Sequence, residues 1–353
     1  MRPRILVLVL VVFASFVAAS CSGDDASGEV DAQRASADPT TTEPARDGCD
    51  PARPADPGTV RRQLVHDGLE RAYELSVPPG YDGEDPAPLL LDLHGFGSNG
   101  AQQNEYTGMP QAAGARGYVV VAPDGGPLSV PSDAPGGHQF DGTPFWNFFG
   151  SGEVSFGEGV APLGLSGDAS SLGADDVSFV AALLDELLDE LCIDASRVYS
   201  TGMSNGAGMS TTLACEIGDR IAAIAPVAGV NLTGHCRGDD PVPVLAIHGD
   251  ADHVAGYDGN LLLGFELGNP SVPDRMAQWA RHNGCAPQPE LDEPFPGVVR
   301  STWVGCAAGA DTELWTVTGG GHVWPKVDGD PPAPFDATDV VLDFFDTHSR
   351  PGR

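Results

Sequence analysis

The chain has few basic residues, and lysine is almost absent from it. Its 353 residues hold 18 Lys and Arg against 50 Asp and Glu, which gives a formal net charge of −32. Lys326 is the only lysine. Nucleic acids and anionic membrane surfaces are bound through Lys and Arg, so we expect neither as a partner. We interpret the acidity as a source of solubility.

The N-terminal apolar run is too short to be a comfortable membrane span. It covers residues 5–17 and follows two arginines, whereas a membrane helix needs about 20 apolar residues. Basic residues, this run and the small residues after it are typical of a secretory signal peptide, which we place at residues 1–20. Small residues directly before Cys21 resemble the lipobox of bacterial lipoproteins, which implies a lipid anchor on Cys21. Cleavage and release is the alternative. Either way the protein is expected outside the cell or at its surface.

Large apolar residues are also scarce just after the signal. Residues 22–58 are rich in Asp, Ala, Ser, Thr and Pro and cannot bury enough surface to fold. We predict a disordered acidic tether over residues 21–58 and one catalytic domain over residues 59–349. We expect no separate substrate-binding module after that domain, and a monomer.

Within residues 59–349, segments typical of strands alternate with segments typical of helices. The expected strands are 63–66, 71–77, 88–93, 117–122, 197–201, 221–226, 243–248 and 313–317. The expected helices are 101–116, 175–191, 207–215, 272–283 and 336–348. Such alternation predicts an α/β fold with a mainly parallel central sheet and helices on both faces.

A Gly-x-Ser-x-Gly motif lies between a strand and a helix at residues 202–206. In a chain with 46 glycines the motif alone is weak evidence. Its position, however, is that of a nucleophile elbow, in which glycines permit a cramped turn that exposes the serine hydroxyl. The helix that follows points its N-terminal amides at developing negative charge. We therefore expect Ser204 to be a nucleophile.

A serine nucleophile needs a base and a carboxylate, and both follow later strands. Ser204, an aspartate and His322 occur in the chain order of α/β-hydrolases. The competing histidines are His94, His248 and His253, and of these four candidates only His322 lies after the last strand. Spacing alone leaves the aspartate open between Asp250 and Asp252. A calcium site there is disfavoured because the Asp-x-Asp-x-Asp-Gly pattern is missing. No metal or cofactor is expected.

The tetrahedral intermediate of such a reaction needs two amide donors. One should be the amide of Asn205, directly after the nucleophile. The other should come from the loop after the strand at residues 88–93, where glycines let the backbone approach the oxyanion. Phe96 is the first choice and Gly97 the second.

The long segment 124–173 is dense in Gly, Pro and Ser but carries several aromatic residues. They are Phe140, Phe145, Trp146, Phe148 and Phe149. They could face a substrate, or they could fill a local core, and the sequence does not separate the two.

Taken together, these motifs resemble the secreted polyhydroxybutyrate depolymerase and feruloyl-esterase-like group of α/β-hydrolases. The matching pieces are His94-Gly95, Trp146-Asn147, Asp175-Asp176-Val177, Ile193-Asp194, Arg197-Val198-Tyr199, residues 202–206, Ala225-Pro226-Val227-Ala228-Gly229, His248-Gly249, Asp252, Gly320-Gly321-His322 and Trp324-Pro325. The resemblance implies an α/β-hydrolase fold in which Ser204 is the nucleophile, Asp252 the acid and His322 the base. Family members often have Val-Pro-Tyr after the acid, where this chain has Val-Ala-Gly-Tyr at 254–257.

The resemblance further implies an exported serine hydrolase of carboxylic esters that acts through an acyl-enzyme. Feruloyl, acetyl-xylan and polyhydroxyalkanoate esters, small or polymeric, are the substrate classes. We expect Trp146, Asn147 and Trp324, which belong to the matching motifs, to contact the substrate. A serine peptidase of the same fold and a non-catalytic surface-binding lipoprotein are the alternatives.

With Cys21 assigned to a lipid, an even set of six cysteines is left, which suggests three disulfides in an exported domain. From the expected layout we pair Cys285 with Cys306 and Cys215 with Cys236. Cys49 then pins the end of the tether to Cys192.

Overall fold

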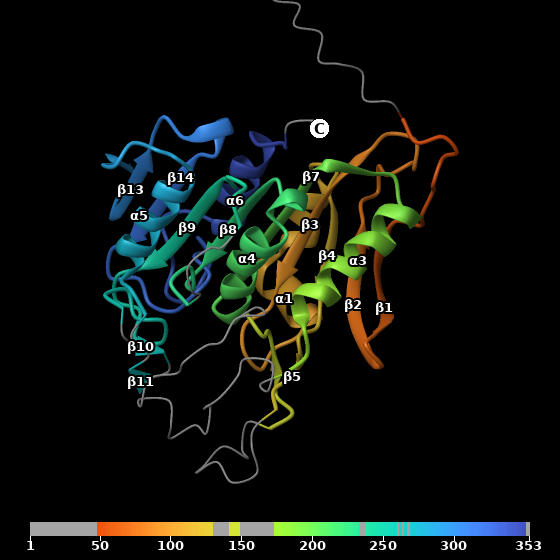
Figure 1. Cartoon of the computed structure of the whole chain (residues 1–353), viewed down its shortest axis with the longest axis horizontal. Coiled ribbons are helices and arrows are strands. Elements are labelled where there is room, and N and C mark those ends of the chain that lie inside the picture. The colour runs from red at the N-terminus through yellow and green to blue at the C-terminus, as the bar shows by residue number, and fades with distance from the viewer. Residues whose placement is uncertain are drawn as a thin grey trace, which may run out of the picture. The chain divides into compact units, whose positions relative to one another are not determined.

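The computed structural model describes residues 48–129, 141–148, 173–232, 238–259, 261–262, 265–266 and 269–350 (Figure 1). Their centre is a mixed sheet with the strand order β1-β2-β4-β3-β7-β8-β9-β14-β13-β12. From β4 to β14 neighbouring strands run parallel, and antiparallel strands extend both edges. The predicted α/β-hydrolase fold with a mainly parallel centre is confirmed.

The strands of this sheet are β1 (Gly58–His66), β2 (Leu69–Val77), β3 (Ala87–Leu93), β4 (Val119–Pro123), β7 (Ile193–Met203), β8 (Ala223–Val227), β9 (Val244–Gly249), β12 (Glu290–Phe295), β13 (Val298–Trp303) and β14 (Thr312–Val317). Two small pairs lie outside it: β5 (Gly126–Pro127) with β6 (Pro144–Phe145), and β10 (Leu261–Leu262) with β11 (Phe265–Glu266).

The helices are α1 (Gly100–Thr107), α2 (Met109–Gly114), α3 (Asp176–Glu190), α4 (Asn205–Glu216), α5 (Val272–His282) and α6 (Ala337–Asp346). Short 3-10 turns, η4 (Gly218–Arg220) and η5 (Ala307–Gly309), complete the described elements. The single helix expected at 101–116 is wrong. It is two helices, because Gly108 adopts a left-handed conformation with φ 69° and Pro110 opens the next helix.

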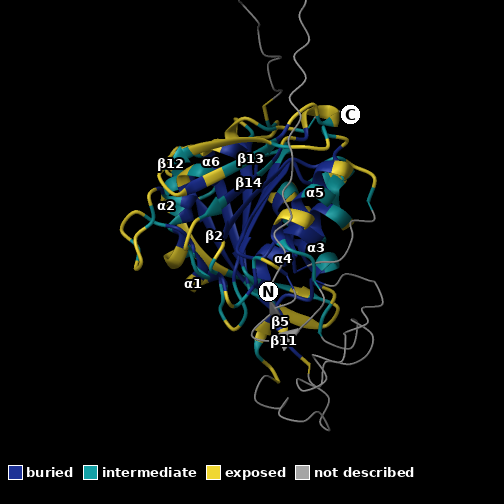
Figure 2. Ribbon diagram, turned by 90° about the vertical axis from the view of Figure 1, so that its left-hand side faces the viewer, coloured by how far each residue is buried: buried dark blue, intermediate teal, exposed yellow. Residues whose placement is uncertain are grey.

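The sheet separates two hydrophobic cores, because side chains along a strand alternate between its faces. In β3, Leu89, Leu91 and Leu93 belong to the core that also holds apolar residues of α3, α4 and α5. Leu90 belongs to the opposite core, with α2 and α6. Figure 2 shows the strands buried between these helices. Strands that are buried at every position, as β3 is, are what a sheet covered on both faces requires.

The hairpin predicted around Asp67-Gly68 is confirmed. Leu69 pairs with His66 across the turn, and Asp67 and Gly68 have φ values of 48° and 78°. Two successive positive φ angles define the tight turn whose twist matches that of a hairpin. The β12–β13 hairpin was not predicted from the sequence.

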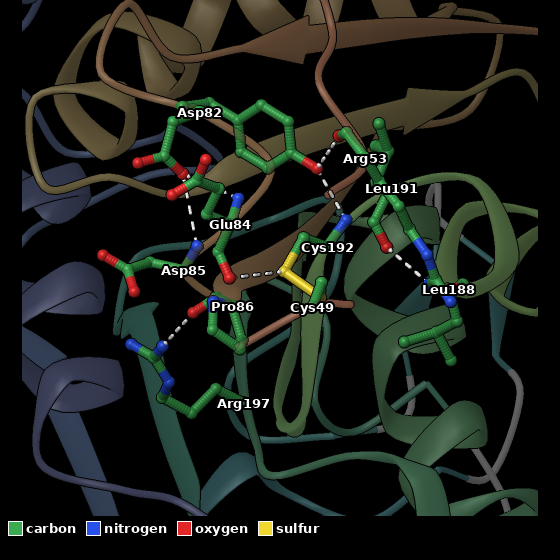
Figure 3. Close-up of a disulfide and its surroundings, with 11 residues drawn as sticks. Cys49, Arg53, Asp82, Glu84, Asp85, Pro86, Leu188, Leu191, Cys192 and Arg197 are labelled. Carbon is green, nitrogen blue, oxygen red and sulfur yellow. Dashed lines mark hydrogen bonds between the residues drawn. A yellow bond between two sulfur atoms is a disulfide. The ribbon is translucent and has the colours of Figure 1, made fainter. Parts of the chain in front are cut away.

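The start of the folded unit is fastened to the loop after α3 (Figure 3). The predicted Cys49–Cys192 disulfide is present. The Arg53 guanidinium donates to the carbonyl of Leu188 at 2.7 Å, near the C-terminus of α3, and the Tyr81 hydroxyl links the Arg53 carbonyl to the Cys192 amide. Ordered structure therefore begins before residue 59, the predicted boundary of the catalytic domain.

The Cys285–Cys306 disulfide is also present as predicted. Cys236, the predicted partner of Cys215, lies outside the described residues, so that pairing stays a prediction. Residues 1–47, which carry the predicted signal peptide, Cys21 and most of the tether, lie outside them too. In the part of the chain that the structure describes, no helix has both the length and the apolar character needed to cross a membrane.

Candidate active site

Ser204 lies at the junction of β7 and α4, and its backbone is strained. Its φ of 56° and ψ of −116° fall outside the regions that L-residues favour. Such a conformation costs about 1–3 kcal/mol and persists only where the surroundings enforce it. The Ser204 amide donates to the Val227 carbonyl at 2.9 Å, and its carbonyl accepts from Gly208 at 3.0 Å. The elbow predicted from the Gly-x-Ser-x-Gly motif is therefore present.

The two motif glycines explain how the turn fits. A β-carbon on Gly202 would meet the Leu93 carbonyl at 2.6 Å, and one on Gly206 would overlap the same carbonyl. Both positions thus press against the end of β3. Gly95, just beyond that strand, lies against the Ser204 side chain, since a β-carbon there would sit 3.8 Å from Ser204 Cβ. The loop expected to hold the oxyanion therefore starts beside the nucleophile.

His322 and Asp252 form a hydrogen-bonded pair. His322 Nδ1 lies 2.7 Å from Asp252 Oδ2. The other carboxylate oxygen, Oδ1, accepts the amides of Val254 and Ala255 at 2.8 and 2.9 Å. Burial raises the pKa of Asp252, but hydrogen bonds from His248 and His322 outweigh burial and hold that pKa well below its usual range. A carboxylate that stays ionised can orient the imidazole and stabilise its protonated form.

Asp250, which spacing could not separate from Asp252, has a different partner. Its Oδ1 accepts the Gly319 amide at 2.6 Å, so it braces the loop that precedes His322. Gly249 packs directly on the Gly320 backbone, where a β-carbon would overlap it. The loops after β9 and β14 are thereby locked together, which keeps His322 beside Asp252.

Trp324 anchors the other side of the histidine loop. It is 3% exposed, its amide donates to the Tyr106 hydroxyl at 2.9 Å, and its indole N–H donates to Thr338 at 3.0 Å. The side chain therefore belongs to the core between this loop and α6, which corrects our expectation of a substrate contact.

The loop after β3, residues 94–97, is the predicted oxyanion loop. Its two candidate donors, the amides of Phe96 and Gly97, differ in their surroundings. The Gly97 amide donates to the Pro144 carbonyl at 2.9 Å, so it is engaged within the protein. Phe96 is half-buried beside it. Asn205 is the first residue of α4, where main-chain amides point out of the helix end. Phe96 and Asn205 stay our predicted oxyanion donors.

Trp146 and Asn147, the other predicted substrate contacts, are 0% and 5% exposed. The Asn205 side chain makes two hydrogen bonds to the Trp146 backbone. The Trp146 amide donates to Asn205 Oδ1 at 2.7 Å, and Asn205 Nδ2 donates to the Trp146 carbonyl at 2.9 Å. The Trp146 indole N–H donates to the His94 carbonyl at 3.0 Å. Burial leaves neither side chain a face for substrate, so these residues connect the nucleophile helix to the oxyanion loop.

Phe145 and Phe148 are buried as well, and Phe148 packs on Gly208 of α4. For Phe145, Trp146 and Phe148 the structure therefore supports the second of the two alternatives, that they fill a local core. Phe140 and Phe149 lie outside the described residues.

A buried ion pair that was not predicted from the sequence is hydrogen-bonded to the backbone of Asn147. Arg71 Nη2 lies 2.7 Å from Asp176 Oδ1, with side chains 5% and 1% exposed. Asp176 Oδ2 accepts the Asn147 amide at 2.7 Å, and the Arg71 guanidinium lies 4.0 Å from the centre of the Phe179 ring. The only sequence signal was Asp176 within a matching family motif, and nothing in the sequence pointed to Arg71.

Both ring nitrogens of His94 are engaged in hydrogen bonds that brace the loop after β3. Its Nδ1 donates to the Gly95 carbonyl at 2.7 Å, and its Nε2 accepts the Gly125 amide at 2.8 Å. Burial lowers the pKa of His94, so the ring is neutral. Within the described ranges, no cluster of three His, Cys, Asp or Glu side chains could hold a metal ion.

No family model matches the chain. It is 30% identical over 260 residues to feruloyl esterase C of Emericella nidulans, covering 71% of this chain and 78% of that one. It is 29% identical over 270 residues to feruloyl esterase D of Neurospora crassa, covering 72% and 74%.

Feruloyl esterase B of Piromyces equi is 29% identical over 260 residues, which span 71% of this chain but only 42% of that enzyme. Among solved structures, an acetyl xylan esterase from Aspergillus awamori aligns with a TM-score of 0.52 over 81% of this chain and 99% of its own. Because the sequence identity to this acetyl xylan esterase is only 14%, its structural similarity shows the fold alone.

Proposed function

The chain belongs to the feruloyl-esterase-like family of α/β-hydrolases and is a carboxylic-ester hydrolase, and we propose that Ser204, Asp252 and His322 carry out its reaction. The observation that carries this proposal is the strained backbone of Ser204. A serine is kept at positive φ between a strand and a helix only where the surrounding structure enforces it, and such positions cluster at active sites.

The hydrogen bond between His322 and Asp252 supports a role for each ring nitrogen of His322. Nδ1 faces Asp252, so Nε2 is the nitrogen left to take the proton of Ser204. Ser204 Oγ then attacks the ester carbonyl, and the amides of Phe96 and Asn205 stabilise the oxyanion. His322 returns the proton to the leaving alcohol, and an acyl-enzyme forms.

Water completes the cycle by the same route. It attacks the acyl carbonyl while His322 Nε2 accepts one of its protons, and the acid leaves as Ser204 regains that proton. Asp252 stays ionised throughout and stabilises the imidazolium that forms twice in each turnover. Net consumption is one ester and one water.

We propose hydroxycinnamoyl esters as the substrate class, because the three relatives above are named feruloyl esterases. A panel of methyl ferulate, p-nitrophenyl acetate and a hydroxybutyrate oligomer tests this proposal. We expect the highest kcat/KM on methyl ferulate. A higher kcat/KM on either of the other substrates would assign the acetyl or the hydroxyalkanoate class instead.

Replacing Ser204 by Ala tests the nucleophile. We expect the turnover of every ester in the panel to fall by at least about 10³-fold, with the thermal midpoint of unfolding within a few degrees of wild type. A variant that kept full activity on p-nitrophenyl acetate would refute the proposed role.

We also propose that the enzyme works outside the cytoplasm, tethered through Cys21. The two disulfides between described residues suit an oxidising compartment. In cells, Cys21→Ser should move the enzyme from the membrane fraction to the medium and abolish its labelling with radioactive palmitate. Release of both proteins to the medium would favour simple cleavage.

A further inference from the structure

Two histidines approach one oxygen of the Asp252 carboxylate. His322 Nδ1 lies 2.7 Å from Asp252 Oδ2, and His248 Nε2 lies 3.2 Å from the same oxygen. His248 Nε2 is also 2.8 Å from the Ala255 carbonyl. The His248 side chain lies in β9 and is 1% exposed, so it can reach neither solvent nor substrate in this arrangement.

These contacts determine where His248 carries its hydrogen. An ionised carboxylate and a carbonyl are both acceptors, so Nε2 must be the donor. Nδ1 is buried and has no hydrogen-bond partner among the described residues. A protonated ring would leave a buried N–H donor unpaired there, which is costly. The contacts therefore fit a neutral ring with its hydrogen on Nε2.

We propose that His248 is a positioning residue that acts on the reaction through Asp252. Its N–H, shared between the Ala255 carbonyl and Asp252 Oδ2, fixes the carboxylate in the rotamer that meets His322. It also draws electron density from the oxygen that His322 uses, so Asp252 holds the His322 proton less tightly. The inference rests on the proposed triad, in which Asp252 and His322 are partners.

The surroundings of His248 limit which other groups can have this effect. Among the described titratable groups, His248 contacts the Asp252 carboxylate, to which His322 is also bonded. The Tyr257 ring lies edge-on to the His248 ring, with the two ring centroids 5.9 Å apart. The Tyr257 hydroxyl is bonded to Thr316, the residue paired with His248 in β14. Asp250 is exposed and bonds the Gly319 amide. In the described part of the chain, His248 is the only residue that adds a second donor to Asp252 Oδ2.

The test compares a substitution that removes the donor with one that keeps it. Methionine in His248→Met has similar bulk and no N–H. Glutamine in His248→Gln carries an N–H close to the place of Nε2. Both are measured in the full chain as kcat/KM for p-nitrophenyl acetate from pH 5 to 9, with thermal unfolding recorded alongside.

Without the second donor, Asp252 Oδ2 becomes more basic and stabilises the His322 imidazolium. We therefore expect the acid limb of the His248→Met profile to move to higher pH, while His248→Gln keeps the wild-type limb. Because the Asp252 carboxylate is no longer fixed in the rotamer that meets His322, we also expect kcat/KM of His248→Met at its pH optimum to fall about ten-fold. Tyr257→Phe, which removes a hydroxyl on the other side of His248, is the matched control and should leave the limb in place. An unshifted limb in His248→Met, or the same shift in His248→Gln, would overturn the proposal.

An NMR spectrum of the wild-type enzyme tests the proposal even if the His248 variants do not fold. With ¹⁵N-labelled histidine, the neutral His248 ring should carry its hydrogen on Nε2, and a hydrogen on Nδ1 instead would overturn the proposal. Asp252→Asn separates this inference from the proposed function. If that variant stayed fully active, the triad itself would fail, whatever the His248 variants showed.

Discussion

At the scale of single residues, Asp250 and Asp252 show how two aspartates in one loop differ in chemistry. Asp252 is buried and meets His322, whereas Asp250 is exposed and holds the Gly319 amide. We expect Asp252→Asn to lower kcat by about 10⁴-fold, because an amide can no longer hold His322 in the required tautomer. Asp250→Asn, the matched control, should keep kcat on methyl ferulate within about ten-fold of wild type, since it loosens only a loop hydrogen bond. Equal losses in the two variants would contradict the assignment of Asp252 as the triad acid.

Asp92 in β3 is a buried acid without a cationic partner among its hydrogen bonds. It is 0% exposed and accepts from Gln103 and Thr107. Burial raises its pKa from 3.8 to about 6, against those hydrogen bonds. Because the folded state binds this proton more tightly than the unfolded chain, stability falls as the pH rises through that interval and levels off above it. The total cost is about 3 kcal/mol.

Asparagine should remove most of that cost. Its oxygen can still accept from Gln103, and its amide can donate to the Thr107 hydroxyl, whose own hydrogen then goes to the Gln103 carbonyl at 3.0 Å. We expect Asp92→Asn to raise the free energy of unfolding at pH 8 by about 1–3 kcal/mol and to flatten its pH dependence between pH 4 and 6. Urea unfolding at several pH values measures both, with exposed Asp219 as the control in Asp219→Asn. If the free energy of unfolding of Asp92→Asn depended on pH as steeply as that of wild type, the pKa of Asp92 would not be raised in the folded state.

The sequence led to the proposed triad, whose members follow strands, but not to the residues whose role depends on packing. Ser204, Asp252 and His322 each come just after a strand, and parallel strands bring such positions to one edge of the sheet. Trp146 and Trp324 look like substrate contacts until their burial is known. Burial depends on which distant segments cover a side chain, and no local pattern reports that.

At the scale of elements, residues 144–148 bridge the oxyanion loop and α4. Pro144 accepts the Gly97 amide, Trp146 is gripped by the Asn205 side chain, and Phe148 accepts the Thr212 hydroxyl further along α4. We expect Asn205→Ala to lower kcat by about 10²-fold with KM within a few-fold. It keeps the main-chain amide but frees the segment that places the Phe96 loop, and small displacements at a reacting centre have effects of this size.

Thr212→Val is the matched control, because it removes a hydrogen bond to the same segment away from the nucleophile. It should cost about 1 kcal/mol of stability and leave kcat within about three-fold. Steady-state kinetics and urea unfolding on both variants decide the matter. If the two substitutions changed kcat equally, the segment would serve stability alone.

Most elements were predictable because their apolar residues recur with the period of a helix or a strand. The failures have local causes. Gly108 and Pro110 end one helix and start another inside a stretch that we assigned to a single helix. The β12–β13 hairpin is exposed along β12, so β12 lacks the buried run that would identify a strand.

At the scale of the whole molecule, the topology followed from a general rule while its long-range contacts did not. Alternating strands and helices favour a parallel sheet covered on both faces, and the layout that follows from it predicted both of the described disulfides. The Arg71–Asp176 pair joins residues 105 positions apart. The chain has 50 acidic residues, so the sequence offers no reason to select Asp176 as the partner of Arg71.

The two described disulfides close loops of very different length, and their contributions to stability should differ accordingly. Cys49–Cys192 spans 143 residues and Cys285–Cys306 spans 21. The loops do not overlap, so each can be removed alone. By the chain-entropy model they stabilise the fold by about 5 and about 3 kcal/mol. Urea unfolding of Cys49→Ser/Cys192→Ser and of Cys285→Ser/Cys306→Ser should therefore show the larger loss in the first pair.

Activity at 25 °C should survive in both double variants, because neither disulfide contacts the site. The hydrogen bonds of Arg53 and Tyr81 also hold the segment after Cys49 in place without the bond. A smaller loss from the 143-residue loop than from the 21-residue loop would contradict the entropic account. It would mean that the unfolded chain already keeps the start of the folded unit close to β7, the strand that ends at Ser204.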